Sequence, residues 1–120
     1  MQIKESAENY LECILMLRAK NGSVRSIDVA HHMAFTKASV SVAMKNFRQE
    51  GYITVDADGE IFLTEKGTEI AQRIYERHQV ITEALMALGV SPETASQDSC
   101  KIEHDISEET FLCIKKFLEK

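Results

Sequence analysis

Long hydrophobic runs are missing from this sequence, and that absence limits what the chain can be. The longest purely apolar stretches are CILML at 13–17 and ALMAL at 84–88. Both are far shorter than the roughly 20 residues that a membrane-spanning helix needs. The opening residues, MQIKESAENY, contain no apolar segment of the kind that a secretory signal carries. We therefore expect a soluble, cytoplasmic protein that has no membrane partner.

Recognisable catalytic motifs are also missing. The sequence has no HExxH metalloprotease motif, no glycine-rich phosphate loop and no convincing Ser/His/Asp order. A catalytic metal needs an open coordination position and a nearby base that activates water. We predict that the chain is not an enzyme and has no small-molecule substrate, with a small metalloenzyme as the alternative.

Cysteines are few. Their odd number, three, and their unpaired spacing favour free thiols in a reducing compartment over a disulfide framework. Cys13 and Cys113 stand among apolar neighbours, where a thiol usually acts as a small buried hydrophobic group. Cys100 instead begins CKIEH, which gathers a thiol, a carboxylate and an imidazole. On a helix, Cys100, Glu103 and His104 would share one face. They are either metal ligands or the ordinary solvent-facing end of a helix.

Acidic residues are absent from positions 30–49, within a stretch that is strongly basic. From 18 to 49 the sequence has six basic residues and one acid, Asp28, a local charge of +5 in a chain whose net charge is −5. From 93 to 120 seven acids and four lysines leave −3. Because the local potential governs phosphate binding, the first half is predicted to face a polyanion. The alternative is ordinary surface heterogeneity.

Hydrophobic periodicity predicts three helices and then a hairpin in the first half. The expected helices are residues 6–20 with Ser6 as N-cap, a short helix capped by Ser26, and a helix from about Lys37 to Glu50 closed by Gly51. The period then changes in YITVDADGEIFLT at 52–64, where two β-branched and aromatic runs flank Asp-Gly. This order is that of a winged helix-turn-helix. A three-helix interaction domain that binds no DNA is the alternative.

The predicted third helix can enter the major groove of double-stranded DNA. The candidate DNA-binding residues are Arg25, Ser26, Thr36, Lys37, Ala38, Ser39, Ser41, Val42 and Lys45. Lysines would contact phosphates, while residues near the helix N-terminus would approach base edges. Since helix-turn-helix heads usually bind palindromic sites as dimers, we expect a palindromic operator.

The second half is predicted to be helical. Apolar residues at helical spacing predict a long helix over about 65–88, a helix carrying CKIEH and a final helix capped by Ser107. The long and final helices have more apolar positions than one small core needs, so we expect a homodimer. The predicted fold is mainly α with a small β-hairpin, a winged helix-turn-helix followed by a helical dimerisation domain.

Taken in order, several segments resemble the diphtheria-toxin-repressor family of manganese- and iron-responsive repressors. The segments are SAENYLECILML, SIDVAHHMAFTKASVSVAMKNFRQEGYI, LTEKG, the RH pair at 77–78, and CKIEHDIS. The resemblance implies a winged DNA-binding domain over 1–64 and a helical metal-binding and dimerisation domain over 65–120. The implied function is metal-dependent repression of metal-homeostasis genes. The sequence stops at Lys120, as expected of short members without a third, SH3-like domain.

The same resemblance implies a set of metal ligands: Asn9, Glu12, His78, Cys100, Glu103 and His104. Such a site would link the first helix to the dimerisation helices, so that a metal could switch the DNA-binding head. By itself, His78 lies on an apolar stripe and would more often be a core histidine.

Two positions depart from the family pattern. Manganese-type members have acids at the positions of Asn9 and Cys100, and iron-type members have methionine and cysteine there. A thiolate suits iron, cobalt or zinc, whereas manganese prefers oxygen ligands. The acid and histidine of the iron-type ancillary site fall on Thr82 and Ser96. We expect Fe²⁺ ahead of Mn²⁺, with Zn²⁺ or Co²⁺ as further candidates; the alternative is a metal-independent regulator with a vestigial site.

Overall fold

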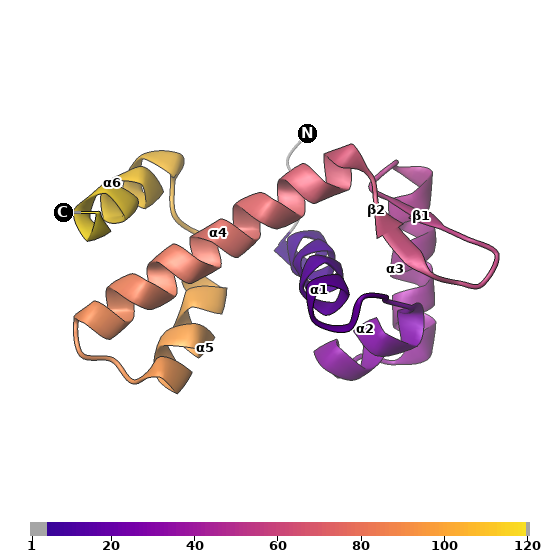
Figure 1. Cartoon of the computed structure of the whole chain (residues 1–120), viewed down its shortest axis with the longest axis horizontal. Coiled ribbons are helices and arrows are strands. Elements are labelled where there is room, and N and C mark those ends of the chain that lie inside the picture. Colours follow the sequence, from indigo (N-terminus) through magenta and orange to yellow (C-terminus); the bar gives the residue numbers. More distant parts are fainter. Residues whose placement is uncertain (1–4, 120) are drawn as a thin grey trace. The chain divides into compact units, whose positions relative to one another are not determined.

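The computed structural model describes residues 5–119, which form helices and one short antiparallel hairpin (Figure 1). The elements are α1 (Glu5–Asn21), α2 (Ser26–Met33), α3 (Lys37–Gln49), β1 (Ile53–Val55), β2 (Ile61–Leu63), α4 (Glu65–Ala87), α5 (Pro92–Ile102) and α6 (Glu108–Leu118). The chain divides into two compact units, Met1–Gln72 and Arg73–Lys120, and the division falls inside α4. None of the helices within residues 5–119 combines the length and the apolar composition of a membrane span.

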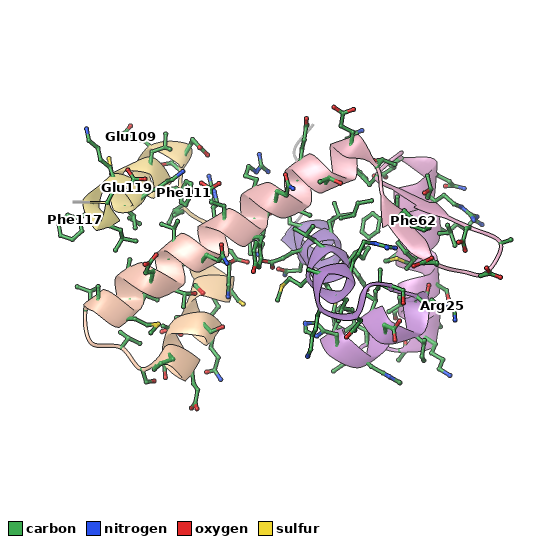
Figure 2. All side chains as sticks on the ribbon, viewed as in Figure 1. Arg25, Phe62, Glu109, Phe111, Phe117 and Glu119 are labelled. Carbon is green, nitrogen blue, oxygen red and sulfur yellow. The ribbon has the colours of Figure 1, made fainter. Side chains whose placement is uncertain are left out.

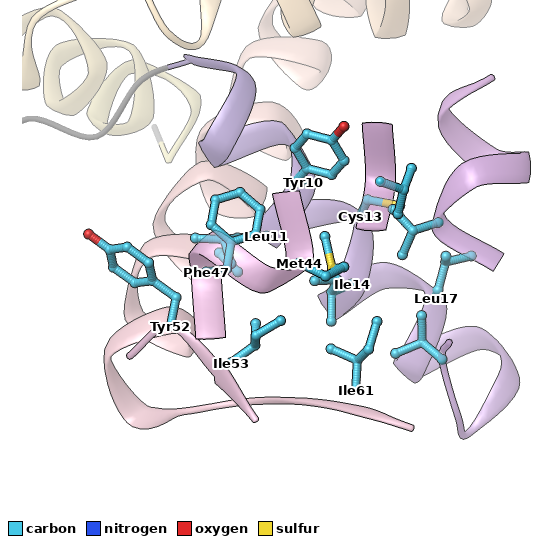
Figure 3. Packing of buried hydrophobic residues seen from close by; sticks show 14 of the residues in the cluster. Tyr10, Leu11, Cys13, Ile14, Leu17, Met44, Phe47, Tyr52, Ile53 and Ile61 are labelled. Carbon is cyan, nitrogen blue, oxygen red and sulfur yellow. The ribbon is translucent and has the colours of Figure 1, made fainter. Parts of the chain in front are cut away.

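The first unit has a hydrophobic core formed by α1, α2, α3 and the hairpin (Figure 3). Its most deeply buried apolar side chains are Leu11, Ile14, Val24, Val29, Val40, Ile53, Ile61 and Ala71, the last from the start of α4. Apolar residues at steps of three and four place one face of each helix against this core. Fully burying one such side chain contributes roughly 1.5–3 kcal/mol. The shared core therefore holds the helix-turn-helix and the hairpin together.

Two backbone features define the turn between α2 and α3. Ala34, which ends α2, has a φ of 57° and is the one non-glycine residue in the described range with positive φ. Thr36 is the N-cap of α3: its Oγ1 accepts the Ser39 N–H at 3.1 Å, and its own hydroxyl donates to Ser39 Oγ at 2.9 Å. This cap starts α3 at Lys37, as the sequence predicted.

Two of the predicted N-caps were wrong. Ser26 is the first residue of α2, and the cap position is taken by Arg25, whose backbone N–H donates to Asp28 Oδ2 at 2.9 Å. Ser6 lies inside α1 rather than before it. The predicted cap at Ser107 is confirmed, because its side chain accepts the N–H three residues further on. A carboxylate in the first turn of α2 thus replaces the expected serine cap.

The LTEKG segment forms a tight junction between β2 and α4. The Thr64 hydroxyl donates to the Gly51 carbonyl oxygen at 2.6 Å, and its Oγ1 accepts the Gly67 N–H at 3.2 Å. Gly67 packs so closely on the backbone of Tyr52 that there is no space for a Cβ atom. The junction therefore requires both the hydroxyl and the glycine.

The predicted hairpin is present, with Thr54 of β1 paired to Phe62 of β2. Asp56 accepts two backbone N–H groups of the connecting loop, both at 2.9 Å, which stabilises the turn. Arg18 of α1 contacts the second strand of the hairpin. Its guanidinium donates to the Ile61 carbonyl and lies 4.3 Å from the centroid of the Phe62 ring.

Arg77 of α4 holds the helices of the second unit together. It is buried, and its guanidinium donates to the carbonyl oxygens of Glu103 and Ile106, both at 3.0 Å, and to Glu108 Oε2 at 2.8 Å. The guanidinium carbon also lies 5.3 Å from the centroid of the Phe111 ring. A buried cation needs such partners, because an uncompensated charge in the interior is strongly destabilising. The contacts tie α4 to both ends of the α5–α6 connection.

The two faces of α6 differ sharply. Phe111 is buried, whereas Phe117 is 72% exposed and points away from the other helices of this unit (Figure 2). Cys113 is exposed, so the prediction that it is buried was wrong. Two residues along a helix turn the side chain by about 200°, which takes Cys113 off the face that Phe111 buries. Cys13 is buried, as predicted.

Candidate metal centre and DNA-binding surface

Three of the predicted metal ligands come together within the second unit. His78 of α4, Cys100 of α5 and Glu103, the residue that follows α5, offer ligand atoms that lie within 4.8 Å of one another. His78 Nδ1 is 3.0 Å from Glu103 Oε2 and 3.7 Å from Cys100 Sγ. An imidazole nitrogen, a thiolate and a carboxylate together suit first-row divalent cations. Cys100 is exposed, so the group is open to solvent on that side.

Glu103 provides the strongest sign that a cation fits here. Its side chain is completely buried. Within the described residues its Oε1 makes no hydrogen bond, although His104 Nε2 lies 3.4 Å away. A buried carboxylate is costly unless it is paired or coordinates a metal. A divalent cation beside Glu103 would neutralise that charge, so the residues present fit the expected metal.

His104 does not lie on the same helix as Cys100. The sequence predicted one helical face for Cys100, Glu103 and His104, but α5 ends at Ile102 and Glu103 is its C-cap. Cys100 and Glu103 keep their spacing of three residues on the last turn, whereas His104 falls in the turn that follows. Arg77 explains this early end, because it binds the Glu103 carbonyl that a longer helix would use internally.

The other two predicted ligands, Asn9 and Glu12, belong to the first unit. They lie three residues apart on α1, a spacing that puts both on one side of that helix. Glu12 is buried and Asn9 is half-buried. Their participation in metal binding stays a prediction from the sequence.

Sequence reasoning missed Ser99 and noted Thr82 and Ser96 only as positions of the iron-type ancillary site, although all three hydroxyl groups lie around His78. Ser99 is completely buried, with its Oγ 3.2 Å from His78 Nδ1 and 2.7 Å from Thr82 Oγ1. Ser96 Oγ lies 3.4 Å from the other ring nitrogen, Nε2. A signal for Ser99 was present in the sequence. Ser99 and Cys100 lie three and four residues after Ser96, so all three share a face of α5.

The chemistry of Cys13 differs from that of Cys100. Burial, and then the nearby Glu12 carboxylate, raise the pKa of the Cys13 thiol to about 12. A thiol that stays protonated is neither a nucleophile nor a metal ligand at neutral pH. Cys13 is therefore a core residue. Of the two exposed thiols, Cys100 is the one that lies with His78 and Glu103.

The candidate DNA-binding residues lie on the first unit. Exposed side chains among them are Arg25, Thr36, Lys37, Ala38, Ser39, Ser41, Val42 and Lys45, and Ser26 is half-buried. Val42 is 61% exposed although it is apolar, which suits contact with a thymine methyl group. A shallow depression of about 290 Å³ is lined by Ser26, Ile27, Lys37 and Ser41, where α2 and α3 approach each other. No acidic residue occurs in the first turn of α3.

Comparison with known proteins covers nearly the whole chain. The family model of the iron-dependent repressor N-terminal DNA-binding domain matches residues 2–60, and that of the iron-dependent repressor metal-binding and dimerisation domain matches residues 64–120. The transcriptional regulator MntR of Escherichia coli O157:H7 is 34% identical over 117 residues, 98% of this chain and 76% of that protein. An uncharacterized HTH-type transcriptional regulator of Methanocaldococcus jannaschii is 33% identical over 120 residues, 98% of this chain and 96% of that one.

Solved structures confirm the predicted winged-helix fold. The structure of the manganese regulator SloR aligns with a TM-score of 0.81 at 25% identity, over 99% of this chain and 55% of that one. The metal-dependent transcriptional regulator MtsR aligns with a TM-score of 0.86 at 25% identity, over 94% of this chain and 53% of that one. The chain therefore spans about half the length of these two proteins.

Proposed function

Since the chain belongs to the iron-dependent repressor family of metal-responsive transcriptional regulators, we propose that it represses genes of metal-ion homeostasis when it binds a divalent cation. It is a DNA-binding regulator and not an enzyme. Its partners are double-stranded DNA, at a palindromic operator, and a second copy of the chain. We place it in the cytoplasm, where thiols such as Cys100 stay reduced.

The observation that carries this proposal is the cluster of His78, Cys100 and Glu103, in which the Glu103 carboxylate is buried. These three residues would hold the cation, and the predicted site adds Asn9, Glu12 and His104. The bound cation supplies positive charge to Glu103 and a fixed link between its ligands. Fe²⁺ and Mn²⁺ are the metals we propose, because the family models name iron and the similar solved regulators name manganese. The Cys100 thiolate also admits Zn²⁺ or Co²⁺.

The DNA surface is proposed on α3 and its flanks. Lys37 and Lys45 would contact phosphates, and Ser39 and Val42 would approach base edges in the major groove. Arg25, Ser26, Thr36, Ala38 and Ser41 complete the proposed surface. The exposed positions of the two lysines and the absence of acids from 30–49 support this assignment.

Dimerisation is assigned to the second unit. Its large exposed apolar side chains are Met86, Leu88, Leu112 and Phe117, with exposures from 44% to 81%. Apolar surface of this kind on a small unit suits burial against a second copy. We propose a DNA-binding domain over 1–64 and a metal-binding and dimerisation domain over 65–120. The changeover between the two family models, from residue 60 to residue 64, supports this boundary.

The test is fluorescence anisotropy with DNA from upstream of the protein's own gene, in Fe²⁺ without oxygen, in Mn²⁺, and in chelator. We expect tight binding with metal and much weaker binding in chelator. Cys100→Ser should weaken the metal dependence, whereas Cys113→Ser, which alters another exposed thiol of the same unit, should leave it intact.

Two results would contradict the proposal. Equal binding with metal and with chelator would favour the metal-independent regulator with a vestigial site. No binding to any promoter DNA in any metal would remove the repressor function itself.

A further inference from the structure

His78 lies in a network of hydroxyl groups from α4 and α5. Ser99 Oγ is 3.2 Å from His78 Nδ1, Thr82 Oγ1 is 2.7 Å from Ser99 Oγ, and Ser96 Oγ is 3.4 Å from His78 Nε2. Ser99 has no exposed surface. A buried hydroxyl that lacks a hydrogen bond is destabilising, so each of these groups needs a donor or an acceptor that matches its own role. The direction of each hydrogen bond can therefore be worked out.

The Ser99 hydroxyl has one proton, and it donates that proton to the Ser96 carbonyl oxygen at 3.0 Å. Thr82 must then donate to Ser99 Oγ. Ser99 Oγ thus faces His78 as an acceptor, and Glu103 Oε2, 3.0 Å from the same Nδ1 atom, is an acceptor as well. Because Ser99 Oγ and Glu103 Oε2 both accept at Nδ1, the neutral form of the His78 ring carries its proton on Nδ1.

From this network we infer that Thr82 and Ser99 are positioning residues of the metal site, and that Ser96 supports the metal-bound form of His78. The inference rests on the proposed metal-binding function. Nδ1 is the nitrogen that faces Cys100 Sγ, at 3.7 Å, as well as Glu103. Thr82 and Ser99 hold the ring in this orientation, so the cation would take Nδ1 and leave Nε2 toward Ser96.

The role of Ser96 follows from which ring nitrogen of His78 carries the proton. A cation held at Nδ1 would use the lone pair of that atom, so the Nδ1 proton would pass to water. Nε2 would take a proton from water, and the ring would stay neutral. The Nε2–H would then donate to Ser96 Oγ, as metal-bound histidines commonly donate their second ring N–H to a fixed acceptor. The hydroxyl groups of Thr82, Ser96 and Ser99 can therefore hydrogen-bond with His78 and with one another in the metal-free and in the metal-bound protein.

The first experiment needs no metal. Ring ¹⁵N shifts of His78 in the metal-free full chain at pH 8, assigned with a His78→Gln variant, should show the proton on Nδ1. A ring protonated on Nε2 in the metal-free protein would overturn the inference.

The second experiment is a titration with Co²⁺, followed by its d–d bands and its thiolate charge-transfer band. Ser99→Ala and Thr82→Val should each weaken Co²⁺ binding about 10- to 100-fold and change the d–d spectrum. Thr82→Ser keeps a hydroxyl and should restore wild-type behaviour. The matched control is Ser91→Ala, which removes the N-cap hydroxyl at the far end of α5. It should lower the melting temperature without changing the Co²⁺ spectrum.

The outcomes separate the two proposals. Wild-type Co²⁺ affinity and spectrum in both Ser99→Ala and Thr82→Val would overturn the inference and leave the proposed function standing. A wild-type chain that binds no Co²⁺, Fe²⁺ or Mn²⁺ would overturn the proposed function and this inference with it. If one variant does not fold, the other decides, because Thr82→Val preserves the shape of the side chain.

Discussion

Gly67 lies so close to Tyr52 that a Cβ atom on Gly67 would be 2.1 Å from the Tyr52 carbonyl oxygen. The clash is with backbone, which cannot move aside as a flexible side chain can. Helix propensity alone would make Gly67→Ala stabilising by up to about 1 kcal/mol. We expect the opposite sign, a loss of about 1–3 kcal/mol in the free energy of unfolding.

Urea unfolding of Gly67→Ala measures this loss. Glu69→Ala changes an exposed position of the same helix and should stay within about 0.5 kcal/mol of wild type. A Gly67→Ala protein as stable as wild type would contradict the close contact.

Ala34→Gly should stabilise the protein. Ala34 has a φ of 57°, a conformation that costs a residue with a Cβ atom roughly 1–2 kcal/mol and costs glycine little. Part of this gain is offset by the greater freedom of glycine in the unfolded chain, so we expect a net gain of about 0.5–1 kcal/mol. Thermal unfolding measures it. Ala43→Gly, in the middle of α3, should instead lose about 1 kcal/mol, and two changes of equal sign would refute the prediction.

Glu103→Gln should separate metal binding from folding. The variant keeps the shape of the side chain but removes a buried negative charge. We expect divalent metal affinity to fall by two orders of magnitude or more, while the metal-free melting temperature stays the same or rises. Calorimetric titration and thermal unfolding give the two values. Glu109→Gln changes an exposed acid of α6 and should leave both unchanged. Retained metal affinity in Glu103→Gln would remove this residue from the site.

The three thiols should differ in reactivity. At pH 8, iodoacetamide should modify the exposed Cys100 and Cys113 of the native metal-free protein and leave Cys13 intact, because Cys13 is buried and its pKa is about 12. Mass spectrometry counts the modified sites. Bound metal should protect Cys100. Modification of Cys13 as fast as Cys100 would contradict the buried, protonated thiol.

The same pKa shift predicts how stability depends on pH. The Cys13 pKa is raised from 9.0 to about 12 on folding. Below pH 9 the thiol is protonated in both states. Between about pH 9 and 12 only the unfolded state loses the proton, so the contribution to stability is lost as pH rises. Cys13→Ala should therefore show a shallower fall in unfolding free energy between pH 8 and 10.5 than wild type, and parallel curves would count against the shift.

Lys45→Ala should weaken binding to operator and non-operator DNA alike. The plot of log affinity against log salt should flatten by about one unit per lost phosphate contact, which is about two units for a dimer that loses one contact in each subunit. Anisotropy at four salt concentrations with metal present measures the slope. Lys101→Ala removes an exposed lysine from the acidic second half and should leave the slope unchanged. An unaltered slope in Lys45→Ala would exclude a phosphate contact by this residue.

Local signals in the sequence accounted for most of the fold. Periodicity located the helices of the described range apart from α5, which begins at Pro92 and ends at Ile102, so that only the first part of CKIEH is helical. The Asp-Gly segment located the hairpin. The errors lie where a tertiary or backbone contact replaced a local preference. Arg77 ends α5 before His104 by binding a carbonyl 26 residues away, and the first turn of α2 uses Asp28 rather than a Ser26 cap.

The candidate site was predictable in part. Cys100 and Glu103 stand out in CKIEH, and His78 followed only from the family resemblance. The shared face of Ser96, Ser99 and Cys100 could be seen in the sequence, but the contact of Ser99 with His78 could not, because the sequence does not say how two separate helices align. Thr82 was noted only as a position of the iron-type ancillary site, and its hydrogen bond to Ser99 is seen only in the structure.

The Thr36–Ser39 hydroxyl pair bears on which chemical groups α3 can select. Thr36 gives its proton to Ser39, which fills one lone pair of Ser39 Oγ and leaves the Ser39 proton available. Ser39 is therefore biased toward acting as a donor. In the major groove the acceptors are guanine N7 and O6, adenine N7 and thymine O4, whereas the amino groups of cytosine and adenine are donors. If Ser39 reads a base as proposed, this helix cap would favour guanine or thymine over cytosine at that base.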